Sequence, residues 1–77
     1  MNDEQKQKAI QFLTIAKKNG YHKEDVKIMG IMACCSNNVD DSLNYLASEV
    51  DKKRPTADIV EELLKHVRKE LIITADD

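Results

Sequence analysis

Hydrophobic residues recur at helical spacing in four segments of the chain, separated by short polar stretches. In residues 3–18, acidic residues come first and basic residues last, an order that the helix dipole favours. The apolar stripe of this segment is Ala9, Phe12, Leu13 and Ala16. Asn19-Gly20 follows as a stop signal, because glycine readily adopts the left-handed conformation that ends a helix. The pattern predicts a first helix over residues 3–18.

A second helix is expected to begin near Lys23 and to end before the polar residues 36–38. It is apolar around much of its circumference, so we expect it to be the central and most buried helix. Gly30 lies in its interior, where glycine costs about 1 kcal/mol relative to alanine. We therefore expect a neighbouring helix to pack closely at Gly30 and to compensate for that cost.

Two further helices follow. Asn38 is a natural N-cap for a third helix, whose stripe is Val39, Leu43, Leu46, Ala47 and Val50. Pro55 prevents this helix from continuing, and Thr56 can cap a fourth helix over residues 56–73. The stripe of the fourth helix is Ile59, Val60, Leu63, Leu64, Val67 and Leu71. The sequence thus predicts an all-α fold in a single domain, residues 1–77.

The overall charge argues against a nucleic-acid partner. The chain of 77 residues has 12 basic and 14 acidic residues, a net charge of −2, and so lacks the basic face that a phosphate backbone requires. The second and third helices can also be interpreted as a helix-turn-helix. In that interpretation Asp40, Asp41 and Glu49 would repel phosphates, and Asn44 is the obvious base-reading residue. A DNA-binding protein therefore stays the less favoured alternative.

The side chains that carry chemistry are few and scattered. His22 and His66 belong to different helices, and the metal-binding spacings CxxC and HExxH do not occur. Cys34 and Cys35 are adjacent, so we interpret them as free thiols in a reducing compartment. With no apolar run long enough for a membrane span, we expect a cytoplasmic or nuclear protein with no membrane partner. We expect no enzyme activity, no metal and no cofactor.

The segment from Leu13 to Val50 resembles the ubiquitin-associated (UBA) domain, a compact three-helix module. The family's marks appear in order as Gly20-Tyr21, Glu24-Asp25, Asn37-Asn38-Val39-Asp40 and Tyr45-Leu46. The resemblance covers about half of the chain. It implies a UBA-like core over residues 3–50, with residues 56–73 as an additional amphipathic helix that a minimal UBA domain lacks.

The resemblance also implies a function and a site. In the UBA family, the Gly-aromatic loop and the end of the third helix form one apolar patch that docks on ubiquitin. Matched to this sequence, the partner-binding residues would be Asn19, Gly20, Tyr21, Tyr45, Leu46 and Glu49. The sequence departs from the family at Asn19, where a methionine is usual, and at Ile31-Met32, which replace an Ala-Leu pair. The resemblance therefore implies a non-catalytic module that binds ubiquitin or a ubiquitin-like protein.

A second interpretation comes from the fourth helix. Its stripe is generous for an isolated surface helix, so the chain can also be a helical adaptor or a subunit that assembles into a homo- or hetero-oligomer through this helix. The sequence alone leaves open whether the fourth helix packs on its own bundle or on a partner.

Overall fold

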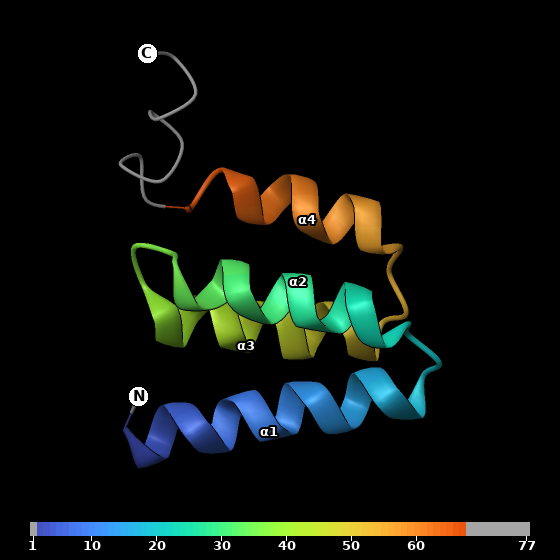
Figure 1. Ribbon diagram of the computed structural model, residues 1–77, viewed down its shortest axis with the longest axis horizontal. Coiled ribbons are helices and arrows are strands. Elements are labelled where there is room, and N and C mark those ends of the chain that lie inside the picture. Colours follow the sequence, from blue (N-terminus) through green and yellow to red (C-terminus); the bar gives the residue numbers. More distant parts are fainter. Residues whose placement is uncertain (1, 68–77) are drawn as a thin grey trace.

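The computed structural model describes residues 2–67, and in this range it shows four helices and no named strand. The helices are α1 (Asp3–Lys18), α2 (Lys23–Cys34), α3 (Val39–Asp51) and α4 (Thr56–Leu64). Figure 1 shows α1 and α4 on opposite sides of a central pair in which α2 lies in front of α3. The prediction of an all-α bundle is confirmed.

The helix boundaries follow the local signals in the sequence. The Asn2 side-chain oxygen accepts a hydrogen bond from the Gln5 N–H at 2.8 Å, which caps α1. Gly20 has a φ of +84°, so the chain turns after α1 through the left-handed conformation that glycine favours. The Asn38 side chain accepts from the Asp41 N–H at 3.0 Å and caps α3, as predicted.

The core is formed mainly around α3. This helix places five residues in the interior, of which Leu43, Leu46 and Val50 are apolar. The buried apolar residues are Phe12, Ala16, Met29, Ala33, Leu43, Leu46, Val50, Ile59 and Leu63. All four helices contribute to this set, so one core holds the described part of the chain together.

The prediction that the second helix is the most buried one is wrong. Only Met29 and Ala33 of α2 are buried, whereas Ile28 and Ile31 are 50% and 55% exposed. The physical reason is geometric: α2 packs on its neighbours with one side, and a helix that is apolar all round must then leave apolar side chains in solvent.

The close helix packing that we expected at Gly30 is also absent. A Cβ atom built on this glycine would have Phe12 Cε2 as its neighbour at 3.9 Å, an ordinary van der Waals distance. A side chain approaches Gly30, and no helix backbone does. The cost of this glycine in α2 is therefore not offset by a tight backbone contact.

The fourth helix begins at Thr56, as predicted, but its N-cap residue and its C-terminal end differ from the prediction. Pro55, and not Thr56, is the N-cap residue, and the Thr56 hydroxyl instead donates to Asp25 Oδ2 of α2 at 3.3 Å. The helix ends at Leu64, well before residue 73. The helix ends early because the residues after Leu64 turn toward the end of α2 and form backbone contacts there. Residues 68–73 of the predicted helix lie outside the described range.

The contacts after α4 fasten it to the α2–α3 connection. The Asn37 N–H donates to the His66 carbonyl at 2.9 Å, and Ser36 and Val67 form an isolated antiparallel bridge. Ile59 and Leu63 are fully buried in the common core. The structure thus places α4 on its own bundle. No helix in residues 2–67 is long and apolar enough to cross a membrane.

Candidate protein-binding surface

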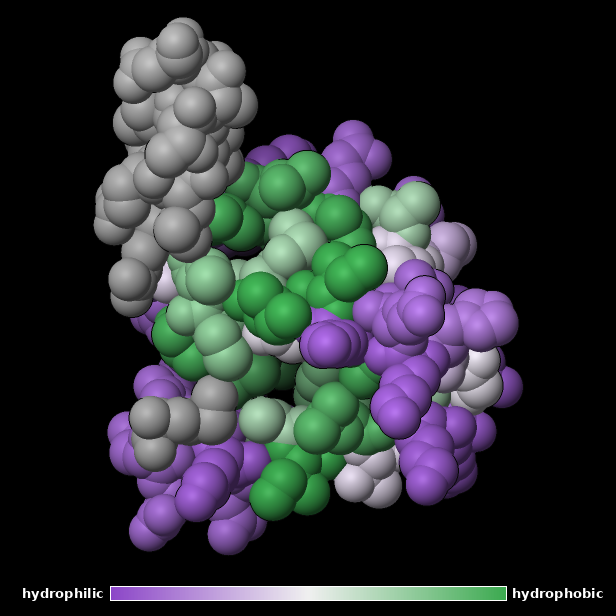
Figure 2. All heavy atoms as spheres, viewed as in Figure 1, coloured by the Kyte–Doolittle hydropathy of each residue, from purple (hydrophilic) through white to green (hydrophobic). Residues whose placement is uncertain are grey.

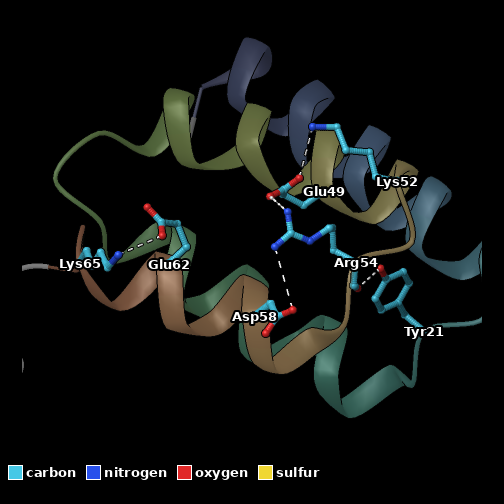
Figure 3. Close-up of polar contacts among 7 residues, drawn as sticks. All are labelled: Tyr21, Glu49, Lys52, Arg54, Asp58, Glu62 and Lys65. Atoms are coloured by element: carbon cyan, nitrogen blue, oxygen red, sulfur yellow. Dashed lines mark hydrogen bonds and ion pairs between the residues drawn. The ribbon is translucent and has the colours of Figure 1, made fainter.

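The turn between α1 and α2 holds the first three residues of the predicted site. Asn19 donates from its side-chain nitrogen to the Val50 carbonyl at 2.7 Å, which ties this turn to the end of α3. Gly20 is exposed. Tyr21 is half-buried, and its hydroxyl donates to the Arg54 carbonyl (Figure 3). Burial, with a smaller contribution from the Glu49 carboxylate, raises the pKa of the Tyr21 phenol.

The other three residues of the predicted site lie on α3. Leu46 is fully buried in the core, and Glu49 is also buried. The Glu49 carboxylate forms ion pairs with Arg54 at 3.6 Å and with Lys52 at 3.5 Å (Figure 3). Tyr45 is half-buried, and burial together with the nearby Glu49 carboxylate raises its pKa to about 12.

The structure brings most of the predicted site together, but around an internal contact. Arg54 pairs with Glu49 through its guanidinium, donates its backbone N–H to the Glu49 carbonyl, and accepts from Tyr21. These interactions fasten the α3–α4 connection to the α1–α2 turn. Leu46, in the core, and Glu49, beside Arg54, are closed to a partner, whereas Gly20, Tyr21 and Tyr45 keep accessible surface. Partner binding at this corner stays a prediction.

Sequence reasoning missed a second surface, which is apolar. Leu13 of α1, Ile28 and Ile31 of α2, and Leu64 of α4 are 47%, 50%, 55% and 52% exposed. Figure 2 shows hydrophobic surface gathered on the side of the molecule where α2 lies, continuing toward α1 and α4. Isolated apolar residues are common on protein surfaces, but a gathering of large ones is typical of an interaction site.

Part of this surface is hollowed into a groove between α1 and α2. One hollow, of about 320 Å³, has Phe12 and Leu43 in its lining together with Gly30 and Ile31. A second hollow, of about 590 Å³, extends to Tyr21. The two share Leu13, Val26 and Lys27, so they form one continuous groove, which we call the α1–α2 groove. Tyr21, predicted from the sequence, thus lies at one end of it.

The α1–α2 groove has a basic rim at its Tyr21 end. Lys17, Lys23 and Lys27 line it there, and all three are exposed. No aspartate or glutamate is among the residues that line either hollow. Within residues 2–67, none of these three lysines belongs to an ion pair. The groove therefore combines an apolar floor with uncompensated positive charge.

A sequence signal for this surface existed. Residues 23–34 are apolar around much of their circumference, and Lys23 and Lys27 are spaced one helical turn apart. An apolar helix with basic residues on one side also fits an exposed interaction surface. The tertiary packing of α2, which decides between this and a buried helix, is not contained in the local pattern.

A polar pocket of about 260 Å³ lies between α3 and α4, with Asp41, Tyr45, Glu62 and His66 in its lining. In residues 2–67, no three His, Cys, Asp or Glu side chains are grouped so that they could hold a metal ion. Cys34 is exposed and Cys35 half-buried, both as free thiols.

Comparison of the chain with known protein families, with curated proteins and with solved structures found no match.

Proposed function

We propose that this protein is a non-catalytic protein-interaction module, and that its partner is ubiquitin or a ubiquitin-like protein. The observation that supports the proposal is the gathering of half-exposed large apolar residues around α2. Full burial of such a side chain contributes about 1.5–3 kcal/mol. A partner that covers Leu13, Ile28 and Ile31 therefore gains a substantial part of its binding free energy from them.

The resemblance to the UBA domain supports the choice of partner. It assigns the Gly20-Tyr21 turn to partner binding, and this turn lies where the α1–α2 groove ends. Tyrosine suits such a position, because its ring contributes contact area at a small cost in conformational entropy. The corner and the groove together form one extended contact surface for a partner's apolar patch.

A titration of the isotope-labelled full chain with unlabelled ubiquitin tests this proposal. We expect backbone amide shifts at Gly20 and Tyr21 and along the groove at Leu13 and Ile31. The absence of shifts at ubiquitin concentrations up to about 1 mM would remove ubiquitin as the partner. The same titration with a ubiquitin-like protein then tests whether the partner belongs to that group instead.

Self-association through α4 is the second candidate function, and the exposed Leu64 favours it. The rest of the expected α4 stripe is less available, because Ile59 and Leu63 are buried in the core. Sedimentation of the wild type and of Leu64→Asp separates the two functions. A dimer that dissociates in the variant would support self-association, and a monomer in both would exclude it.

A further inference from the structure

We infer that the α1–α2 groove binds an acidic amphipathic helix of a partner protein. The inference rests on the part of the proposed function that makes the apolar surface a protein-binding site, and it goes beyond that function. The acidic helix is a second ligand, which would compete with the apolar patch of ubiquitin for the same groove. Helix-in-groove binding needs an apolar trough for residues spaced three and four apart, and a rim that matches the charge on the helix flanks. The groove has both features, at different positions along its length.

The trough is provided by residues from three helices. Phe12 of α1 and Leu43 of α3 are almost completely buried and lie at its floor, while the half-exposed Leu13 and Ile31 stand on either side. Gly30 also lines the trough, and its missing side chain leaves the floor open there. The lining is almost entirely apolar, so it accepts Leu, Ile or Phe side chains and disfavours polar ones.

The lysines on the rim determine which charge the bound partner helix should carry. Lys23 and Lys27 are one turn apart on α2, and Lys17 faces the same hollow from α1. With no carboxylate in the lining, the local charge is positive although the whole chain carries −2. Aspartate or glutamate residues beside the apolar stripe of the bound helix complement these lysines and accelerate its association.

The same observations favour a protein helix over other anionic partners. A lipid surface is contacted by a projecting apolar helix face, whereas the apolar floor here is recessed between two helices. A nucleic acid would place charged phosphates and polar base edges against that floor. Three lysines also supply few of the phosphate contacts on which nucleic-acid affinity depends.

The probe that tests the inference is a fluorescein-labelled synthetic helix with Leu at spacings of three and four residues and Glu at its flanks. A second peptide carries the same Leu residues with Lys in place of Glu. We expect the full chain to bind the acidic peptide at least about tenfold more tightly than the basic one, with an affinity that falls as salt is raised. Equal binding of both peptides would overturn the inference.

Two variants of equal charge change locate the contact. Lys17→Glu reverses a charge on the rim, whereas Lys18→Glu reverses the exposed neighbour that does not line the groove. We expect Lys17→Glu to weaken binding of the acidic peptide about tenfold and Lys18→Glu to change it less than about threefold. Equal losses in the two variants would show an unspecific charge effect and would contradict the inference.

Further arms of the experiment separate other occupants of the groove. The sequence after Val67 contains Leu71 and Ile72 with Asp76 and Asp77, a composition that also fits this groove. If the double variant Leu71→Asp/Ile72→Asp in the full chain binds the peptide about tenfold more tightly, the chain's own end is the occupant and the inference falls. Sedimentation showing a dimer that the peptide dissociates, or tighter binding to anionic vesicles than to the peptide, would contradict it equally.

Failure of the inference and failure of the proposed function give different results. If Ile31→Asp reduces ubiquitin binding but both peptides bind equally, the apolar surface is an interface and only the charge specificity is wrong. If Ile31→Asp changes neither ubiquitin binding nor peptide binding, the proposed function of the surface is wrong as well.

Discussion

Helices α2 and α3 are of similar length, but α2, the more apolar of the two, is the less buried. Within its 13 residues, α3 carries four carboxylates and still places five residues in the interior. Within its 12 residues, α2 is the more apolar helix, yet it buries two and leaves Ile28 and Ile31 half exposed. In α3 the apolar positions fall on one line, whereas in α2 they surround the helix.

The comparison shows that the placement of the apolar side chains around a helix, and not their number, decides which helix of the central pair is the more buried. The two buried polar residues of α3, Ser42 and Glu49, each interact with neighbouring side chains, but Glu49 Oε2 does so through an ion pair and not through a hydrogen bond. The Ser42 hydroxyl donates to Ser36 Oγ at 2.8 Å, and the Glu49 carboxylate pairs with Arg54 and Lys52. The apolar excess of α2 has no such partner within the described chain, and we assign it to binding.

The largest effect that separates the two helices is expected from truncating their apolar residues. Leu46→Ala in α3 creates a cavity in the core and should lower the free energy of unfolding by about 2–5 kcal/mol. Ile31→Ala in α2 removes a half-exposed side chain and should cost less than about 1 kcal/mol. Urea denaturation of both variants checks this. Equal losses would contradict the central position of α3.

The next largest effect concerns the hydrogen bond between two buried serines, Ser36 of the α2–α3 connection and Ser42 of α3. Ser36→Ala removes the acceptor of the Ser42 hydroxyl and should cost about 1–3 kcal/mol, because a buried donor then lacks a partner. Ser42→Ala is the matched control, since Ser36 keeps its 2.7 Å bond to the Ala33 carbonyl. Thermal unfolding should rank Ser42→Ala as the milder change, and the reverse order would refute this role of the pair.

Replacing Gly30 in α2 and Gly20 in the preceding turn by alanine should change the free energy of unfolding in opposite directions. Gly30→Ala should stabilise the protein by about 0.5–1 kcal/mol, because alanine favours the helix and its Cβ meets Phe12 at an ordinary distance. Gly20→Ala should destabilise it by about 1–2 kcal/mol, because the φ of +84° disfavours any side chain. Chemical denaturation checks both. A destabilising Gly30→Ala would indicate tight packing on this face of α2.

The smallest effect concerns the pH dependence of the α3 corner. Burial and the nearby Glu49 carboxylate raise the folded-state pKa of Tyr45 from its ordinary value of 10.0 to about 12, so the neutral phenol contributes its full stabilisation of the fold below pH 10. Between pH 10 and 12 an unfolded chain loses this proton first, and stability should fall. The loss should be modest, because solvent screens a half-exposed ring. Tyr45→Phe should flatten the decline when unfolding is measured from pH 9 to 11; an unchanged slope would exclude Tyr45 as its source.

The sequence was sufficient for the helices themselves. Local signals such as Gly20, Asn38 and Pro55 mark three of the boundaries, because each acts within a few residues of its own position. The end of α4 was misplaced since it depends on Ser36 and Asn37, which meet residues 66 and 67 only in the folded chain. Local patterns do not contain such contacts.

The candidate site was predicted less completely than the fold. Tyr21 was singled out and lies at the end of the α1–α2 groove. Leu46 belongs to the apolar stripe of α3, which already indicated burial, and the structure places it in the core. The pattern predicts α2 as the most buried helix and so does not indicate Ile28 and Ile31 as surface residues, because the sequence does not show on which side α2 meets its neighbours. Surface residues of this kind become visible only once the packing of the helices is known.

A pair of charge insertions tests the central claim, that the apolar surface between α1 and α2 is the contact site. Ile31→Asp and Ile10→Asp place the same charge at isoleucines of similar exposure, 55% and 59%, of which only Ile31 lines the groove. In titration calorimetry with ubiquitin, Ile31→Asp should weaken binding about tenfold or more, whereas Ile10→Asp should stay within about twofold of the wild type. Unchanged affinity in Ile31→Asp, with both variants folded, would contradict the claim.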